Sequence, residues 1–372
     1  MAELSRLNHD LLSQILALVD GPALAAVSSV SSELHGVSRE ENLWQRISLD
    51  TWPSTREEGA RSLISSSGGF ARFYGDSFPL IAYRPMEEDP DLLPSDDDDE
   101  PETHLSPSDL VSFVDVYYEN KCVFSKVLYG IPGAVNQDKY SSWFSCCPFR
   151  IDLLQHRNSR NANDNYDGYD DDDDDDRYDD ALDEEDDETG MFPSVHFGDK
   201  KERGGGKLCK KLEKKMRLSW VLLNKRSGRA VNLSSWRPLT VQRHWPAEGD
   251  ISMRFGCVVA TPAECVISVK CRLLDKESCL KWRAISLRME DRDGRHLNGG
   301  RSLSFLERAL SCCSRSRKWL EFERGYGEYT REKKKVKEKK LRNEGMVDGM
   351  CVFAGIAMFS GLCYLGHSMV MC

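Results

Sequence analysis

Apolar residues at helical spacing dominate the first fifty positions of the chain. After Asn8, a residue that caps helices, the apolar residues recur every three or four positions, which predicts an amphipathic helix. Pro22 suits the first turn of a second helix, and Ser38 with Glu41 has capping-box spacing before a third. The pattern therefore predicts three short helices over 4–49 around a small apolar core.

The helical pattern continues as far as the first acidic stretch. A further helix is predicted over 56–65, and Phe70, Phe73, Tyr74 and Phe78 then follow at helical spacing. These aromatic residues predict a helix that packs back onto the first fifty residues.

From Leu110 onward the pattern changes from helical to extended. Short apolar runs are separated by turn residues, and Gly228 is placed to supply the positive φ of one turn. The predicted strands are 110–118, 122–128, 149–154, 218–223, 230–233, 251–260, 264–273 and 280–290. Short strands at such intervals favour an antiparallel sandwich or a curled sheet, which a helix over 302–310 would close.

The C-terminal stretch has no charged residue between Met350 and Met371. That is about the length of helix that crosses a bilayer, and the basic run over 331–342 comes just before it. The pattern predicts a transmembrane helix that anchors the protein, with its bulk in the cytosol. A buried helix or peripheral attachment is the alternative, and the basic run alone would suit nuclear targeting or nucleic-acid binding.

Charge is distributed unevenly along the chain. The formal net charge is −10, yet seventeen acidic residues and a single arginine lie between Asp164 and Glu188. Such a run repels itself and buries little apolar surface, which predicts a largely disordered insertion over 155–206. The thirteen cysteines have no zinc-like spacing, so neither a metal site nor a cofactor is predicted.

The motifs of the first fifty residues resemble an F-box. The family pattern falls on Leu7-Asn8, Asp10-Leu11-Leu12, Ile15-Leu16, Leu24, Val30-Ser31-Ser32-Glu33-Leu34 and Leu43-Trp44, with Asn8 in place of the usual Pro and Leu34 in place of Trp. Asp50-Thr51-Trp52-Pro53 and Asp76-Ser77-Phe78-Pro79 are similar to segments of plant F-box proteins.

This resemblance implies the substrate-recognition subunit of a Skp-cullin-F-box ubiquitin ligase. Such a subunit docks onto a Skp-family adaptor, is not itself an enzyme, and presents a protein substrate for ubiquitination. The residues implied to bind the adaptor are Leu7, Leu11, Leu12, Ile15, Leu16, Leu24, Val27 and Trp44. A membrane scaffold with a vestigial F-box is the alternative.

A second group of candidate residues lies around two turns of the strand-rich region. Aromatic faces beside arginines suit the binding of a peptide or a sugar ring, although these residues could equally be core and solvated surface. The group is Arg217, Trp236, Arg237, Gln242, Arg243, His244 and Trp245. A lectin-like module carried on an F-box is therefore a further alternative, and no nucleic-acid partner is predicted.

Together these patterns predict an α+β chain in six parts. A three-helix F-box (1–50) and a helical extension (51–85) precede an acidic linker (86–104). A β-rich domain (105–325) contains the acidic insertion and is followed by a basic juxtamembrane segment (326–345) and the transmembrane helix (350–371). Outside a membrane, the nucleus or cytoplasm is the alternative location.

Overall fold

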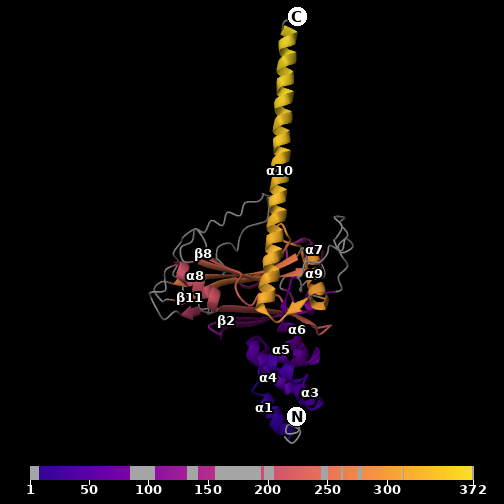
Figure 1. The fold of residues 1–372 in the computed structure, drawn as a ribbon, viewed down its shortest axis with the longest axis vertical. Coiled ribbons are helices and arrows are strands. Elements are labelled where there is room, and N and C mark those ends of the chain that lie inside the picture. The colour runs from indigo at the N-terminus through magenta and orange to yellow at the C-terminus, as the bar shows by residue number, and fades with distance from the viewer. Residues whose placement is uncertain are drawn as a thin grey trace, which may run out of the picture.

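The chain forms an α+β structure in which helices, two β-sheets and one long helix follow one another in space. The computed structural model describes residues 8–83, 105–131, 141–155, 194–196, 205–243, 250–260, 263–274, 279–312 and 314–370. Figure 1 shows the N-terminal helices at one end, the sheets across the middle, and a long helix that carries the C-terminus to the opposite end. The acidic run between Asp164 and Glu188 lies outside the described residues.

Four helices, not the predicted three, form the N-terminal unit. They are α1 (His9–Leu16), α2 (Gly21–Val27), α3 (Ser32–Ser38) and α4 (Glu41–Thr51). The additional helix α3 begins where the Ser31 hydroxyl accepts a hydrogen bond from the backbone N–H of Leu34 at 3.2 Å. The predicted cap of α4 is wrong, because the Ser38 hydroxyl donates instead to the backbone carbonyl of His35.

The predicted helical extension packs against α4. It consists of the 3-10 helix η2 (Pro53–Arg56), α5 (Glu58–Ser66) and α6 (Phe70–Ser77). Phe70, Phe73 and Tyr74 are buried, and the ring of Tyr74 lies 5.3 Å from that of Trp44. The aromatic spacing therefore predicted both a helix and its packing partner correctly.

Two sheets form the β-rich part of the chain. The first has the order β12-β1-β7-β6-β2-β3. Its strands are β1 (Leu80–Ile81), β2 (Leu110–Tyr118), β3 (Lys121–Tyr129), β6 (Met216–Asn224), β7 (Ala230–Asn232) and β12 (Arg315–Ser316). All pairings in it are antiparallel except that of β1 with β7, where Leu80 lies beside Asn232.

The second sheet has the order β4-β11-β10-β9-β8, and β5 also pairs with β11. Its strands are β4 (Arg150–Gln155), β5 (Ser194–His196), β8 (Thr240–Arg243), β9 (Asp250–Ala260), β10 (Ala263–Leu274) and β11 (Cys279–Glu290). Three short helices accompany the sheets: α7 (Ser141–Cys146), α8 (Gly205–Lys215) and α9 (Gly299–Cys312). Strand β5 and the start of α8 fall at the C-terminal end of the insertion predicted to be disordered.

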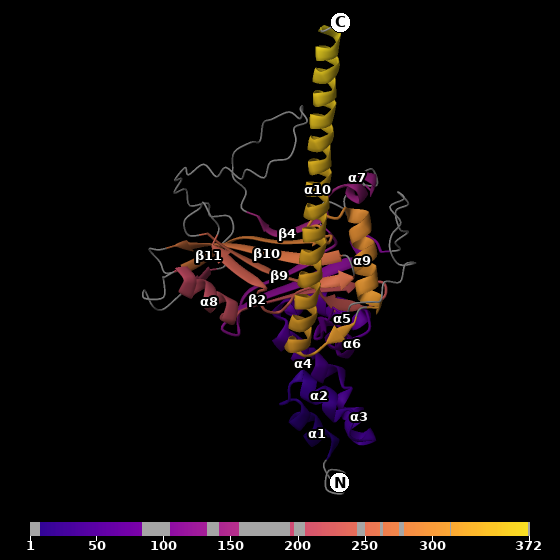
Figure 2. The same cartoon turned by 45° about the horizontal axis from the view of Figure 1, so that its top comes forward.

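The first sheet lies between the N-terminal helices and the second sheet. Strand β2 is buried along all nine of its residues, because its two faces belong to two different cores. Val114 and Val116 contribute to the core between the sheets, whereas Val111 and Phe113 contribute to the core of the N-terminal helices. Figure 2 shows the same layering from a second direction. The predicted sandwich is therefore covered on one side by the F-box-like helices.

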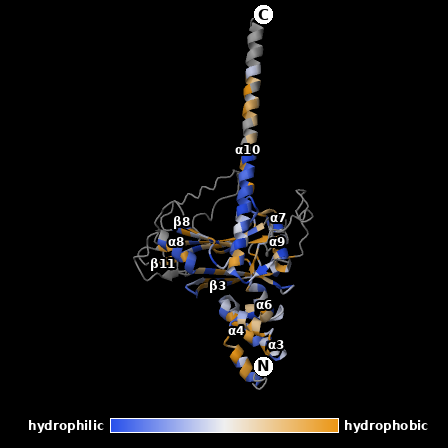
Figure 3. Ribbon diagram, viewed as in Figure 1, coloured by the Kyte–Doolittle hydropathy of each residue, from blue (hydrophilic) through white to orange (hydrophobic). Residues whose placement is uncertain are grey.

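The last helix, α10 (Trp319–Val370), is long and contains a highly charged part followed by a more apolar part. Among the described residues, no helix is both long enough and apolar enough to cross a membrane, so the predicted transmembrane helix over 350–371 is wrong. Figure 3 shows that the first part of α10 is largely hydrophilic, and the charged residues of 331–342 lie there. Gly355, Ser360 and Gly361 occur within the later, more apolar part of the sequence. The membrane location that was predicted from this helix is corrected with it.

A buried charge cluster holds the first part of α10 against the second sheet. The Glu264 side chain on β10 is 2% exposed and contacts Lys333 of α10 at 3.0 Å and Arg254 of β9 at 2.8 Å. Tyr326 of α10 donates a hydrogen bond to the same carboxylate at 2.6 Å. Burial alone would raise the pKa of Glu264, but the two cations and the tyrosine hydroxyl outweigh it and lower that pKa.

Candidate adaptor-docking surface

Helix α1 carries two apolar stripes that face in different directions. Leu12 and Leu16 are 7% and 4% exposed and belong to the core of the N-terminal helices. Leu11 and Ile15 are 48% and 50% exposed, and Leu18, in the turn that follows, is 86% exposed. Leu11 and Ile15, at positions i and i+4, lie on one side of the helix, and the exposed Leu18 follows in the turn after it. We call Leu11, Ile15 and Leu18 the α1 surface.

The other residues implied to bind the adaptor have structural roles within the helical unit. Leu24 and Trp44 are buried, and Val27 is half-buried against the same core. The indole N–H of Trp44 donates to the backbone carbonyl of Ser38 at 2.7 Å, which joins α4 to the end of α3. Leu7 lies outside the described residues. The predicted set is therefore divided between core residues and the exposed α1 surface.

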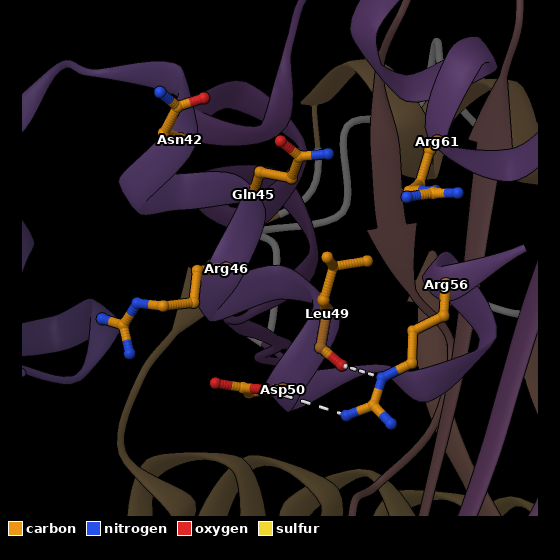
Figure 4. Close-up of a pocket in the computed structure, with 7 residues that line it drawn as sticks. All are labelled: Asn42, Gln45, Arg46, Leu49, Asp50, Arg56 and Arg61. Carbon is orange, nitrogen blue, oxygen red and sulfur yellow. Dashed lines mark hydrogen bonds and ion pairs between the residues drawn. The ribbon is translucent and has the colours of Figure 1, made fainter. Parts of the chain in front are cut away.

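A groove runs along the outer face of α4. It has a volume of about 470 Å³, and Figure 4 shows the side chains that line it. They come from one face of α4, from η2 and from α5: Asn42, Gln45, Arg46, Leu49, Asp50, Arg56 and Arg61. The groove was not predicted from the sequence, although Asn42, Gln45, Arg46 and Leu49 have the spacing of one helix face.

Positive charge predominates in the groove. Three arginines line it against a single carboxylate, and that carboxylate, on Asp50, lies 3.7 Å from the Arg56 guanidinium. Arg56 also donates to the carbonyl of Leu49 at 3.1 Å, and Arg46 makes a long 3.5 Å contact with the carbonyl of Val19, just after the α1 surface. The apolar α1 surface therefore has a basic groove near its C-terminal end.

Polar contacts fix the helical unit on the first sheet. The Asp115 carboxylate on β2 is fully buried and accepts hydrogen bonds from the N–H and the hydroxyl of Ser54 at 2.8 and 2.6 Å. It also accepts one from the Ser125 hydroxyl at 2.7 Å. Burial raises the pKa of Asp115 to about 6, and the hydrogen bonds from these serines act against that rise.

Two further bonds span the same boundary. The indole N–H of Trp52 donates to the Ser219 hydroxyl at 2.9 Å, and the Tyr117 hydroxyl donates to the carbonyl of Thr51. Because these partners are buried or half-buried, the helices and the sheet are joined by packed contacts as well as by the chain itself.

The second predicted group of residues is brought together only in part. Trp236 and Arg237 follow β7, and the Trp236 ring lies 5.5 Å from that of Tyr117. Arg243 ends β8, at the edge of the second sheet. His244 and Trp245 lie outside the described residues. One alternative was that the tryptophans are core residues and the arginines are solvated. Trp236 is half-buried and Arg237 is exposed.

The chain therefore combines a four-helix unit, which has an exposed apolar surface, with a β-sandwich on which that unit is fixed. Its sequence is similar to those of three Arabidopsis thaliana proteins. It is 30% identical over 370 residues to "F-box protein At2g27310", covering 96% of this chain and 94% of that protein. It is 30% identical to "Probable F-box protein At2g36090" and 28% identical to "F-box protein At3g44326", covering 91% and 87% of their lengths.

These relatives match almost the full length of the chain, sandwich and long helix included. The chain therefore belongs to the plant F-box proteins. No family model matches the sequence, and no solved structure matches the chain.

Proposed function

We propose that this protein is the substrate-recognition subunit of a Skp-cullin-F-box ubiquitin ligase. In this proposal the α1 surface binds a Skp-family adaptor, and through it a cullin-RING ligase, while the β-sandwich binds the protein to be ubiquitinated. In this role the chain links its substrate to the ligase and does not itself catalyse ubiquitination.

The exposure of Leu11, Ile15 and Leu18 is the observation that carries the proposal. A small helical unit with room for Leu12, Leu16, Leu24 and Trp44 in its core has no structural need for three more large apolar side chains on its surface. Exposed apolar residues that gather on one helix face are typical of a protein-binding surface. Membership of the F-box family supports an adaptor as the partner.

The first test is binding of a purified plant Skp-family adaptor to the full chain and to a Leu11→Ala/Ile15→Ala variant. If both side chains are buried in the complex, each truncation costs about 1.5 kcal/mol of binding free energy, or roughly tenfold in affinity. Because both residues are exposed in the free protein, the free energy of unfolding should change by no more than about 0.5 kcal/mol. Titration calorimetry and thermal unfolding measure the two quantities.

Matched controls lie on the same helix. His9→Ala alters an exposed polar position on the opposite side of α1 from Leu11 and Ile15 and should leave adaptor binding unchanged. Leu12→Ala should instead lower the free energy of unfolding by about 2–5 kcal/mol, because it removes a core side chain. Adaptor binding that is equally strong in the wild type and the Leu11→Ala/Ile15→Ala variant would exclude the α1 surface as the docking site.

A further inference from the structure

The outer segment of α10, residues 343–370, extends away from the rest of the molecule. Lys340 donates a hydrogen bond to the Asp293 carboxylate at 3.1 Å, and no later side chain of α10 bonds to another element within the described residues. Figure 1 shows the helix continuing alone beyond the sheets toward the C-terminus. The described elements of the same chain therefore leave most of this segment uncovered.

Large apolar side chains of the outer segment are exposed to solvent. Seven of them are more than half exposed: Met346, Met350, Val352, Phe353, Ile356, Met358 and Phe359. The exposed fraction reaches 75% for Phe353. Soluble chains rarely leave so many neighbouring apolar side chains in water, and an apolar surface of this kind marks a contact with another molecule.

Six of these seven residues share one side of the helix. They fall in two stripes with i, i+4, i+7 spacing: Met346, Met350 and Phe353, and Val352, Ile356 and Phe359. With 3.6 residues per turn, the two stripes lie about 120° apart and border one broad apolar face, whereas Met358 lies on the opposite side. We call these six residues the α10 face. A broad apolar face on a helix is suited to packing against another helix.

The distribution of charge along α10 selects the orientation of such a second helix. Residues 331–342 include eight basic and two acidic residues, a net charge of +6, whereas 343–370 contain two acidic residues and no lysine or arginine. If two copies of α10 paired in parallel, their basic runs would lie side by side and repel each other. If the outer segments pair in antiparallel orientation, each basic run lies beyond the overlap, at the opposite end of the pair.

The antiparallel arrangement also brings opposite charges together. The C-terminal end of a helix has a partial negative charge, because its last carbonyls have no partner within the helix. Helix α10 ends at Val370, and in the antiparallel pair this end lies beside the basic run of the other copy. With the twofold axis at Ile356, Phe353 lies opposite Phe359 of the partner subunit. The outer segment is therefore complementary to an inverted copy of itself in both charge and apolar surface.

We propose that the outer segment of α10 pairs with the outer segment of a second copy of this chain, in antiparallel orientation, through the α10 face. The same residues contribute from both copies, as in other twofold dimers. The N-terminal helices lie at the other end of the molecule from the outer segment, so the dimer places its two α1 surfaces far apart (Figure 1). The dimer does not depend on the adaptor role, but it would give a ligase subunit two substrate-binding modules.

The test is sedimentation velocity of the full chain over a range of concentrations, in which the wild type should have the mass of two chains. Phe353→Glu/Ile356→Glu places charges at the centre of the α10 face. Each apolar side chain buried between the copies contributes about tenfold in affinity, so this variant should raise the dissociation constant at least about a hundredfold. Both residues are exposed in the single chain, so the variant should still fold.

The matched control puts the same charges on the other side of the helix. Cys351 and Met358 are exposed there, so Cys351→Glu/Met358→Glu should sediment like the wild type. Small-angle X-ray scattering then tests the orientation. An antiparallel dimer is longer than the single chain formed by Phe353→Glu/Ile356→Glu, because its two sandwiches lie at opposite ends of the paired helices. A parallel dimer would have nearly the same maximum dimension as that single chain.

Four results would overturn the proposal. They are a wild type that sediments as a single chain, equal dissociation of the variant and its control, a dimer no longer than the single chain, and binding of the α10 face to phosphatidylcholine–phosphatidylserine vesicles without dimer formation. Adaptor binding is measured on the same preparations. Phe353→Glu/Ile356→Glu should bind the adaptor with the same affinity as the wild type, so failure of the dimer and failure of the adaptor role are separate outcomes.

Discussion

At the scale of single residues, the spacing of apolar residues predicted that α1 is an amphipathic helix. It did not predict which of the apolar side chains are buried. The spacing predicted a single apolar face, to which Leu11, Leu12, Ile15 and Leu16 would all belong, whereas the structure buries only Leu12 and Leu16. The sequence does contain a signal, since Leu11, Ile15 and Leu18 have their own i, i+4, i+7 spacing. The sequence alone cannot show which stripe is buried, because this depends on where α2, α3 and α4 pack against α1.

Asp115 should make stability depend on pH. Because burial raises its pKa to about 6, from 3.8, folding takes up a proton between these values. The stability that this proton contributes is fully present below about pH 4 and is lost as the pH rises through 6. We expect the wild type to lose up to about 3 kcal/mol relative to Asp115→Asn between pH 4 and 7. Urea unfolding at a series of pH values measures this difference.

Ser125→Ala is the control for that experiment. It removes one hydrogen bond to Asp115 but leaves the carboxyl group, so the pH dependence between 4 and 7 should persist. A parallel pH profile for the wild type and Asp115→Asn would show that the carboxyl group does not titrate in this window.

Gly228 was predicted from its turn, and the structure adds a second constraint. Its φ is 61°, and a Cβ at this position would lie 1.7 Å from the backbone carbonyl oxygen of Ser67, at the end of α5. Gly228→Ala should therefore lower the free energy of unfolding by about 2 kcal/mol or more, from backbone strain and a displaced α5 contact. Gly75→Ala, in α6 with open space around it, should change stability by less than about 1 kcal/mol. Thermal unfolding of the two variants compares them.

At the scale of elements, local sequence patterns predicted most strands. They failed where long-range contacts determine whether a segment forms a strand and which strand it pairs with. The hairpin of β2 and β3 was predicted from its two apolar runs, and Glu119 and Asn120 form its turn with positive φ. The pairing of β1 with β7 and β12 was not predicted, because a two-residue strand has no detectable periodicity. Helix α10 was misread because an uncharged stretch of suitable length was taken as sufficient for a membrane span.

The attachment of α10 should depend on Glu264. Replacing it by Gln leaves Arg254 and Lys333 next to a neutral group in a largely buried site. Removing one partner of a buried ion cluster typically costs about 3–5 kcal/mol, and we expect the lower part of this range because both cations are partly exposed. Hydrogen exchange over residues 319–333 should accelerate in Glu264→Gln. Lys334→Gln, which removes an exposed pair with Glu338, should leave exchange there unchanged.

At the scale of the whole molecule, local spacing in the sequence did not predict that the N-terminal helices and the first sheet share a core. The predicted boundaries treat the F-box, its extension and the sandwich as consecutive parts. The structure shows that Val111, Phe113 and Val221 of the sheet belong to the same core as Leu24 and Trp44 of the helices. Local spacing cannot reveal such a shared core, because it joins residues as far apart in the chain as Leu24 and Val221.

This shared core limits how freely the two modules can be exchanged between proteins. A helical unit transplanted from another family member would have to pack on the outer face of β2 and β6. There, Asp115 and Ser219 accept hydrogen bonds from Ser54 and Trp52 in this protein. A chimera joined near residue 83 should therefore fold poorly unless that face is transplanted too. In evolutionary terms, the adaptor-facing helices and the first sheet are expected to diverge as one unit, leaving the second sheet freer to vary.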